Sequence, residues 1–102
     1  MINTNIKNSH LRIENLFKSI FTEVPHTSIS LNDESVIIEH NDQSNPDAAS
    51  IEIIKLEELY KVSYWDGYSL AEEETEKDLN KALKIFKRFS KKMAKNLVKF
   101  SN

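Results

Sequence analysis

The spacing of apolar residues changes twice along the chain, and this change constrains the fold more than any other feature. A period of about 3.6 residues indicates a helix with one apolar face, whereas strict alternation indicates a strand with one buried face. A helical period gives way to alternation near residue 28 and returns near residue 70. The sequence therefore predicts a helix, a group of strands and a second helix, in that order.

The N-terminal helix is predicted over residues 8–23. Asn8 or Ser9 can cap its first turn, and Pro25 ends it because proline disfavours helical geometry in the residue before it. Its apolar residues follow the i, i+3, i+4 spacing of a single buried stripe. The stripe consists of Ile13, Leu16, Phe17, Ile20, Phe21 and Val24.

Four strands are predicted between the two helices. They lie at residues 28–31, 35–39, 50–56 and 59–65. A turn at 32–34 joins the first two strands, a polar loop at 41–47 follows, and Glu57 and Glu58 form the last turn. Because sequential strands with short connections pair antiparallel, we expect a four-stranded meander. Glu39 and Glu52 are expected to share its exposed face.

The C-terminal helix is predicted to run from Leu70 to about Lys99. Ser69 and Glu72 match a capping box, and Glu72–Glu74 would lie at the positive end of the helix dipole. The apolar stripe consists of Leu79, Ala82, Leu83, Phe86, Phe89, Met93 and Leu97. A helix of this length would measure about 45 Å, so we expect it to break near Ser90 or to project beyond the sheet. The predicted architecture is a single α+β domain over residues 1–102, αββββα, with both helices on one sheet face.

Charge is strongly segregated along the chain. The last 22 residues carry eight Lys or Arg and no acid, whereas the first 80 carry sixteen acids and six bases. The C-terminal cations form one helix face, at Lys81, Lys84, Arg88, Lys91, Lys92, Lys95 and Lys99. Such a face is typical of a solvated amphipathic helix, but it could also bind nucleic acid or an acidic protein surface, including that of a second copy. Only one of these cations is Arg, and no aromatic residue is interleaved for base stacking.

Composition excludes several classes of function. The absence of cysteine rules out disulfides and thiolate chemistry, and a single glycine, Gly67, cannot build a glycine-rich phosphate loop. His10, His26 and His40 do not have metal-ligand spacing, and no catalytic motif is present. We therefore expect no enzyme activity, no metal and no cofactor. Without a signal peptide or a membrane-spanning segment, the expected location is cytoplasmic.

Aromatic and acidic residues gather around the end of the last predicted strand. Tyr60 and Tyr64 are expected in the core, while Trp65 has the opposite parity and should point to the uncovered face beside Asp66. Trp and Tyr dominate the energetics of protein interfaces, so this Trp is a candidate anchor. A Trp folded under a loop is the alternative. The acidic residues would form a solvated surface, a surface for a basic protein or, least favoured, an acid–base or metal site.

The segment Tyr64–Glu74, with the size, composition and architecture of the whole chain, resembles small cytosolic immunity proteins encoded beside bacterial polymorphic toxins, including those of contact-dependent growth-inhibition systems. The resemblance implies binding to one cognate toxin domain, commonly a basic nuclease, whose active site or substrate-binding surface would be covered. These proteins are diverse in fold, so no functional residue is carried over. The contact residues expected from charge and exposure are Trp65, Asp66, Tyr68, Glu72, Glu73 and Glu76.

Two other classes of function remain open. The first is a nucleic-acid-binding regulator that uses the basic helix face between Lys81 and Lys99. The second is a homodimeric scaffold or chaperone in which the long helix packs against its mate. Ile85 and Val98 lie off the main apolar stripe and favour an extra contact there.

Overall fold

The computed structural model describes residues 5–41 and 48–100, apart from the side chains of Lys99 and Phe100. The predicted loop at 41–47 therefore lies outside the described residues, except for Asn41. A short 3-10 helix (Lys7–Ser9) precedes the first α-helix. The remaining elements are α1 (His10–Ile20), β1 (Thr27–Leu31), β2 (Ser35–His40), β3 (Ser50–Lys55), β4 (Tyr60–Trp65), β5 (Leu70–Glu76) and α2 (Leu79–Phe100).

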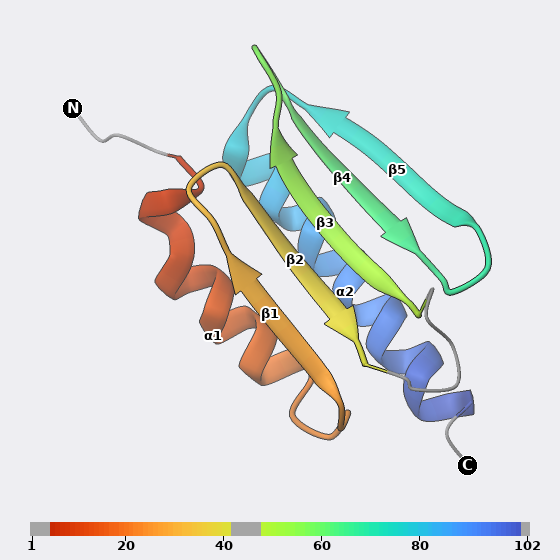
Figure 1. The fold of residues 1–102 in the computed structure, drawn as a ribbon. Helices are drawn as coiled ribbons and strands as arrows, with labels where there is room; N and C mark the ends of the chain where they lie inside the picture. Colours follow the sequence, from red (N-terminus) through yellow and green to blue (C-terminus); the bar gives the residue numbers. More distant parts are fainter. Residues whose placement is uncertain (1–4, 42–47, 101–102) are drawn as a thin grey trace.

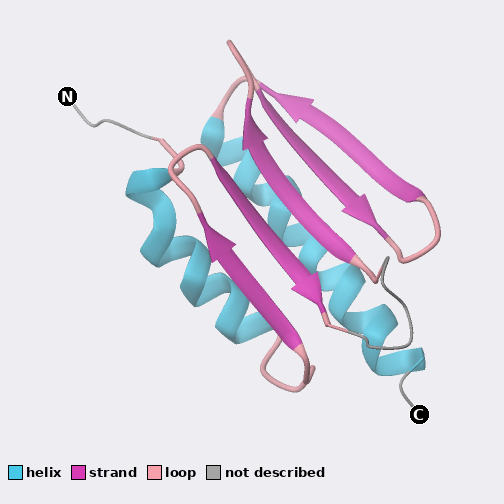
Figure 2. Ribbon diagram, in the orientation of Figure 1, coloured by secondary structure: helices cyan, strands magenta, loops and turns pink. Residues whose placement is uncertain are grey.

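The strands form one antiparallel sheet in the order β1-β2-β3-β4-β5, so each strand pairs with its neighbours in sequence. Both helices pack on the same face of this sheet (Figures 1 and 2). α2 contacts β3, β4 and β5, while α1 contacts β1 and α2. The predicted α+β meander with a helix at each end is confirmed, but the sheet has five strands and not four.

The prediction of a helix beginning at Leu70 is wrong. Leu70–Glu76 forms the fifth strand, and α2 begins only at Leu79. The segment pairs along the whole of β4, which would otherwise expose a row of unpaired backbone groups. The true cap of α2 is Asp78, whose Oδ1 accepts a hydrogen bond from the Asn80 amide at 3.0 Å. The capping-box pattern at Ser69 and Glu72 therefore does not mark a helix start.

Of the two alternatives for the long helix, a break near Ser90 does not occur, because α2 continues without interruption from Leu79 to Phe100. Its 22 residues correspond to about 33 Å, since the helix begins nine residues later than predicted. The C-terminal turns still reach past the ends of the strands in Figure 1, as the alternative expectation required.

The hydrophobic core lies between α2 and the inner face of the sheet. The strands contribute alternate residues to it, and Tyr60 and Tyr64 are buried there as predicted. Full burial of each large apolar side chain contributes about 1.5–3 kcal/mol, so this layer dominates the stability of the fold. The fully buried apolar residues of β2–β4 and α2 are Val36, Ile38, Ile51, Ile53, Val62, Ala82, Phe86, Phe89 and Met93.

Ser90 is the one polar residue of the described chain that is buried in this core. Its hydroxyl has no hydrogen-bond partner among the described residues. A buried hydroxyl without a partner loses its bonds to water and gains nothing in return, at a cost of about 1–3 kcal/mol. Ser90 therefore reduces the stability of α2 without interrupting it.

We expect Ser90→Ala to raise the free energy of unfolding by about 1–2 kcal/mol, because it removes the unpaired hydroxyl and favours the helix slightly. Urea unfolding followed by circular dichroism measures the change. Ser30→Ala, at an exposed strand position, is the matched control and should shift stability by no more than about 0.5 kcal/mol. A loss of stability in Ser90→Ala would show that the hydroxyl makes a favourable bond in solution.

Candidate protein-binding surface on the open face of the sheet

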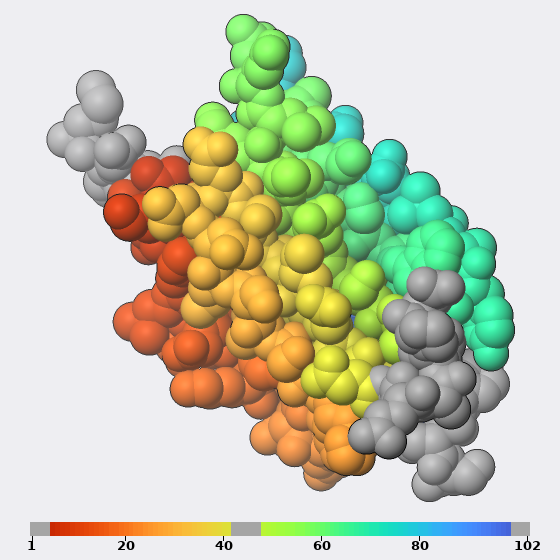
Figure 3. All heavy atoms as spheres, viewed as in Figure 1, coloured from red at the N-terminus to blue at the C-terminus, as the bar shows by residue number. Residues whose placement is uncertain are grey.

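The face of the sheet opposite the helices carries a row of side chains from every strand. Strand register places Glu52 beside Ser63 and Ser63 beside Glu73. In the next row, Glu39 opposes Ser50, Ser50 opposes Trp65 and Trp65 opposes Leu70, with Glu39 and Glu52 sharing the face as predicted. Figure 3 looks onto this face. No helix of the described chain packs against it.

An aromatic side chain at the end of β4 shares this face with carboxylates of β2, β3 and β5. Trp65 points to the open side, as its parity predicts, and is half-buried. Ser63 donates a hydrogen bond from Oγ to Glu73 Oε2 at 3.2 Å. Lys61 is the one basic residue on this face of the described strands, so the surface is acidic. We define the open-face patch as Glu39, Glu52, Ser63, Trp65, Leu70 and Glu73.

The turn between β4 and β5 extends the patch with exposed apolar residues. Asp66 Oδ1 accepts hydrogen bonds from the amides of Tyr68 and Ser69, both at 2.9 Å. Gly67 adopts a φ of 102°, a conformation open to glycine without steric cost. The turn leaves Tyr68 88% exposed. A rigid turn therefore presents this ring to solvent at the corner of the sheet.

A β-bulge beside the turn determines which residues share the patch. The register shifts between Tyr64 and Trp65, so Tyr64 opposes Glu72 while Trp65 opposes Leu70. Leu70, 52% exposed, thus lies next to Trp65 on the open face. Bulges commonly redirect side chains at functional surfaces. The helix predicted from Leu70 onward does not place this residue on the sheet, and no local sequence pattern marks the bulge that does.

The other face of β5 is tied to α2 by two ion pairs. Glu72 pairs with Lys92, and Glu74 pairs with Arg88. All four side chains remain partly exposed, so each pair contributes no more than about 1 kcal/mol. These carboxylates point toward the helix and are absent from the open face.

The Tyr64 side chain adds a partly buried polar contact between β4 and α2. Its hydroxyl oxygen accepts a hydrogen bond from Asn96 Nδ2 at 3.0 Å. Burial raises the pKa of Tyr64 above its ordinary value, although the Asn96 hydrogen bond acts in the opposite direction. Tyr64 therefore stays neutral at physiological pH and serves to position α2 against β4.

The six predicted contact residues do not form one surface. Trp65, Asp66, Tyr68 and Glu73 lie together at the corner of the open face. Glu72 is on the helix side, paired with Lys92. The last of the six, Glu76, lies at the opposite end of β5, where its Oε1 accepts a hydrogen bond from the Lys77 amide at 3.1 Å.

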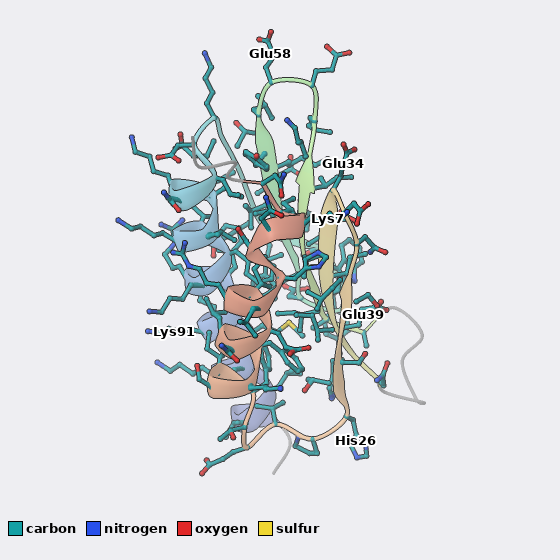
Figure 4. The ribbon with its side chains drawn as sticks, turned by 90° about the vertical axis from the view of Figure 1, so that its left-hand side faces the viewer. Lys7, His26, Glu34, Glu39, Glu58 and Lys91 are labelled. Atoms are coloured by element: carbon teal, nitrogen blue, oxygen red, sulfur yellow. The ribbon has the colours of Figure 1, made fainter. Side chains whose placement is uncertain are left out.

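The outer face of α2 is basic, on the opposite side of the molecule from the open-face patch (Figure 4, where Lys91 is labelled). Arg88 and Lys92 of this face are engaged with β5. The other lysines of the described helix surface are exposed and form no ion pair with the described residues. They are Lys81, Lys84, Lys87, Lys91 and Lys95.

The pKa of the Asp66 carboxyl should report the hydrogen bonds of the turn between β4 and β5. Hydrogen bonds from the Ser69 and Tyr68 amides favour the carboxylate and lower the pKa of Asp66 below its ordinary value of 3.8. A lowered pKa in the folded state means that its contribution to stability is present above pH 3.8 and is lost as the pH falls below that value. A two-dimensional NMR titration of side-chain carboxyls should show a midpoint for Asp66 below 3.8. A midpoint at or above 3.8 would contradict the turn geometry.

Neither a metal site, a membrane-spanning helix nor a similar known protein is found for the described part of the chain. In residues 5–41 and 48–100, no group of three or more His, Asp or Glu side chains is arranged to hold a metal ion. None of the described helices is long and apolar enough to cross a membrane. Comparison with models of known protein families, with curated proteins and with solved structures finds no match for this chain.

Proposed function

We propose that the protein is an immunity protein that binds a basic toxin domain, a nuclease, through the open-face patch and covers its active site or substrate-binding surface. The observation that carries this proposal is that Trp65, at the end of β4, shares the face opposite the helices with Glu39, Glu52 and Glu73. The proposed role is binding, with no reaction catalysed by this chain.

The chemistry of the patch suits a basic partner. Carboxylates at the positions of Glu52 and Glu73 attract lysine and arginine side chains that otherwise contact phosphates, and they accelerate the encounter of the two proteins. Trp65 and Tyr68 offer large rigid surfaces that lose little conformational entropy on binding. Aromatic anchors that share a face with carboxylates therefore support both affinity and discrimination against acidic proteins.

The test begins with purification of the tagged protein from its own cells, followed by identification of the co-purifying protein. A cognate toxin must be lethal when expressed alone and harmless with this chain. Isothermal titration calorimetry then measures the affinity of each variant for the toxin domain. We expect Trp65→Ala to weaken binding by about 30-fold or more, the scale of an interface hot spot.

A charge-matched pair of double variants tests the acidic part of the patch. Glu52→Gln with Glu73→Gln should slow association with the basic partner at low salt. Glu57→Gln with Glu58→Gln changes the formal charge equally, but in the exposed β3–β4 turn at the far end of the sheet (Figure 4). Equal effects of the two pairs, or wild-type affinity in a folded Trp65→Ala variant, would contradict the proposal.

The second candidate function is nucleic-acid binding by the five exposed lysines of α2. Engagement of Arg88 and Lys92 by β5 weighs against it, because the helix then offers no unpaired arginine to phosphates. We expect binding to a 20-base-pair DNA duplex to be weaker than about 100 μM at physiological salt. Micromolar binding with a slope of log K against log salt of about −4 would instead favour this function. In that case the double variant Lys84→Gln with Lys91→Gln should bind more weakly and with a shallower slope.

A further inference from the structure

The two edges of the sheet differ in their protection against pairing with another strand. β5 carries Glu72, Glu73, Glu74 and Glu76 and has a bulge at its start. Charges and bulges are the usual devices that keep an edge strand from pairing. β1, at the other edge, has the sequence Thr-Ser-Ile-Ser-Leu with no charge, no proline and a regular register with β2. β1 is therefore the unprotected edge.

The hydrogen-bond ladder shows which backbone groups of β1 face outward. The Asn32 amide donates to the Ser35 carbonyl at 2.9 Å, and the Asn41 amide donates to the His26 carbonyl at 2.6 Å. Hydrogen-bonded positions alternate along an antiparallel pair, so Ser28 and Ser30 also bond to β2. The N–H and C=O groups of Thr27, Ile29 and Leu31 consequently point away from the sheet.

Helix α1 is held alongside β1 by a contact at the C-terminal end of the strand. His10 Nε2 lies 2.7 Å from the carbonyl oxygen of Asn32, just beyond the end of β1. At the start of the strand, within the loop that connects α1 to β1, the Thr27 hydroxyl donates to the Val24 carbonyl at 3.0 Å. An 11-residue helix and a five-residue strand both measure about 17 Å, so the two elements match in length.

α1 also extends outward past β1, as Figures 1 and 4 show. Helices pack about 8–10 Å apart, whereas strands are about 4.8 Å apart, so one helix covers two strands. Among the strands, α1 makes its main contacts with the edge strand β1, and its outer side reaches below the place that a sixth strand would occupy. Phe17, Ile29 and Leu31 are apolar but only half-buried in this region.

We propose that the β1 edge takes an extended segment of a partner protein as a sixth strand. The segment would hydrogen-bond to the outward backbone groups of Thr27, Ile29 and Leu31, a mode known as β-augmentation. Its apolar side chains would alternate toward α1 and Phe17, and its polar side chains would lie beside Ser28 and Ser30 on the open face. This inference is independent of any binding at the open-face patch.

A second copy of the chain does not fit this edge. Symmetric antiparallel pairing of two β1 strands requires a two-fold axis between them and perpendicular to the sheet, which places both α1 helices on the same side of the joined sheet. Each α1 already extends past its own β1, so the two helices would overlap beneath the junction. An extended segment without its own helix at that position meets no such obstacle.

Two capped seven-residue peptides test the edge directly. Both have valine at alternate positions, with lysine at the intervening positions in one peptide and glutamate in the other. Amide hydrogen exchange by NMR is measured with and without millimolar peptide. We expect the Ile29 and Leu31 amides to exchange fast in the free protein and several-fold more slowly with peptide, while the Ser28 and Ser30 amides are protected in both states.

Lysines introduced on the edge strand identify the strand that the peptide joins. Ser28→Lys with Ser30→Lys changes exposed side chains and should favour the glutamate peptide over the lysine peptide by about fivefold, through cross-strand charge pairs. Ala71→Lys with Thr75→Lys, at exposed positions on β5, changes the formal charge equally. It is the matched control and should leave the β1 preference unchanged. Both double variants keep the backbone ladder, so each reports binding in a folded protein.

Three results would overturn the proposal. The first is an Ile29 amide that stays unprotected at millimolar concentrations of both peptides. The second is a peptide preference that responds to the β5 variant and not to the β1 variant. The third is a dimer in analytical ultracentrifugation whose Ile29 amide is already protected without peptide, because this result would assign the edge to a second copy.

Discussion

The packing of α2 against the inner face of the sheet is the interaction on which the rest of the structure depends. Phe86, Phe89 and Met93 are fully buried against alternate residues of the strands, and burial on this scale provides most of the driving force for folding. Once this layer occupies one sheet face, the opposite face and the two sheet edges remain for contacts with other molecules. Both surfaces proposed for binding follow from this division.

The segregated charges of the sequence acquire a more specific meaning in three dimensions. Two glutamates of β5 neutralise Arg88 and Lys92 within the molecule, so the basic helix face offers fewer free cations than its composition indicates. The acids that remain on the open face, Glu39, Glu52 and Glu73, share that face with Trp65. The molecule therefore presents an acidic face with aromatic residues at one corner and, on its other side, a lysine face without aromatics.

The sequence predicted about half of the candidate site. The parity of Trp65 correctly placed its side chain on the open face, and the predicted strands correctly placed Glu39 and Glu52 there, because alternation is a local property of any strand. Glu72 and Glu76 were grouped with Trp65 under the assumption of a helix, which the structure replaces with a strand. Leu70 was missed for the same reason, since its position beside Trp65 requires the bulge between Tyr64 and Trp65.

The sequence by itself determined α1, the strands β1–β4 and the buried stripe of α2, because the period of apolar residues records which face of each element is buried. Only the tertiary structure decided that residues 70–76 form a strand and not a helix. Glutamate is a good helix former and the Ser69–Glu72 pattern imitates a cap, so local information favours a helix there. The strand forms because β4 supplies a free edge, while Arg88 and Lys92 supply countercharges from 14 and 20 residues away. Contacts at such separations leave no local pattern in the sequence.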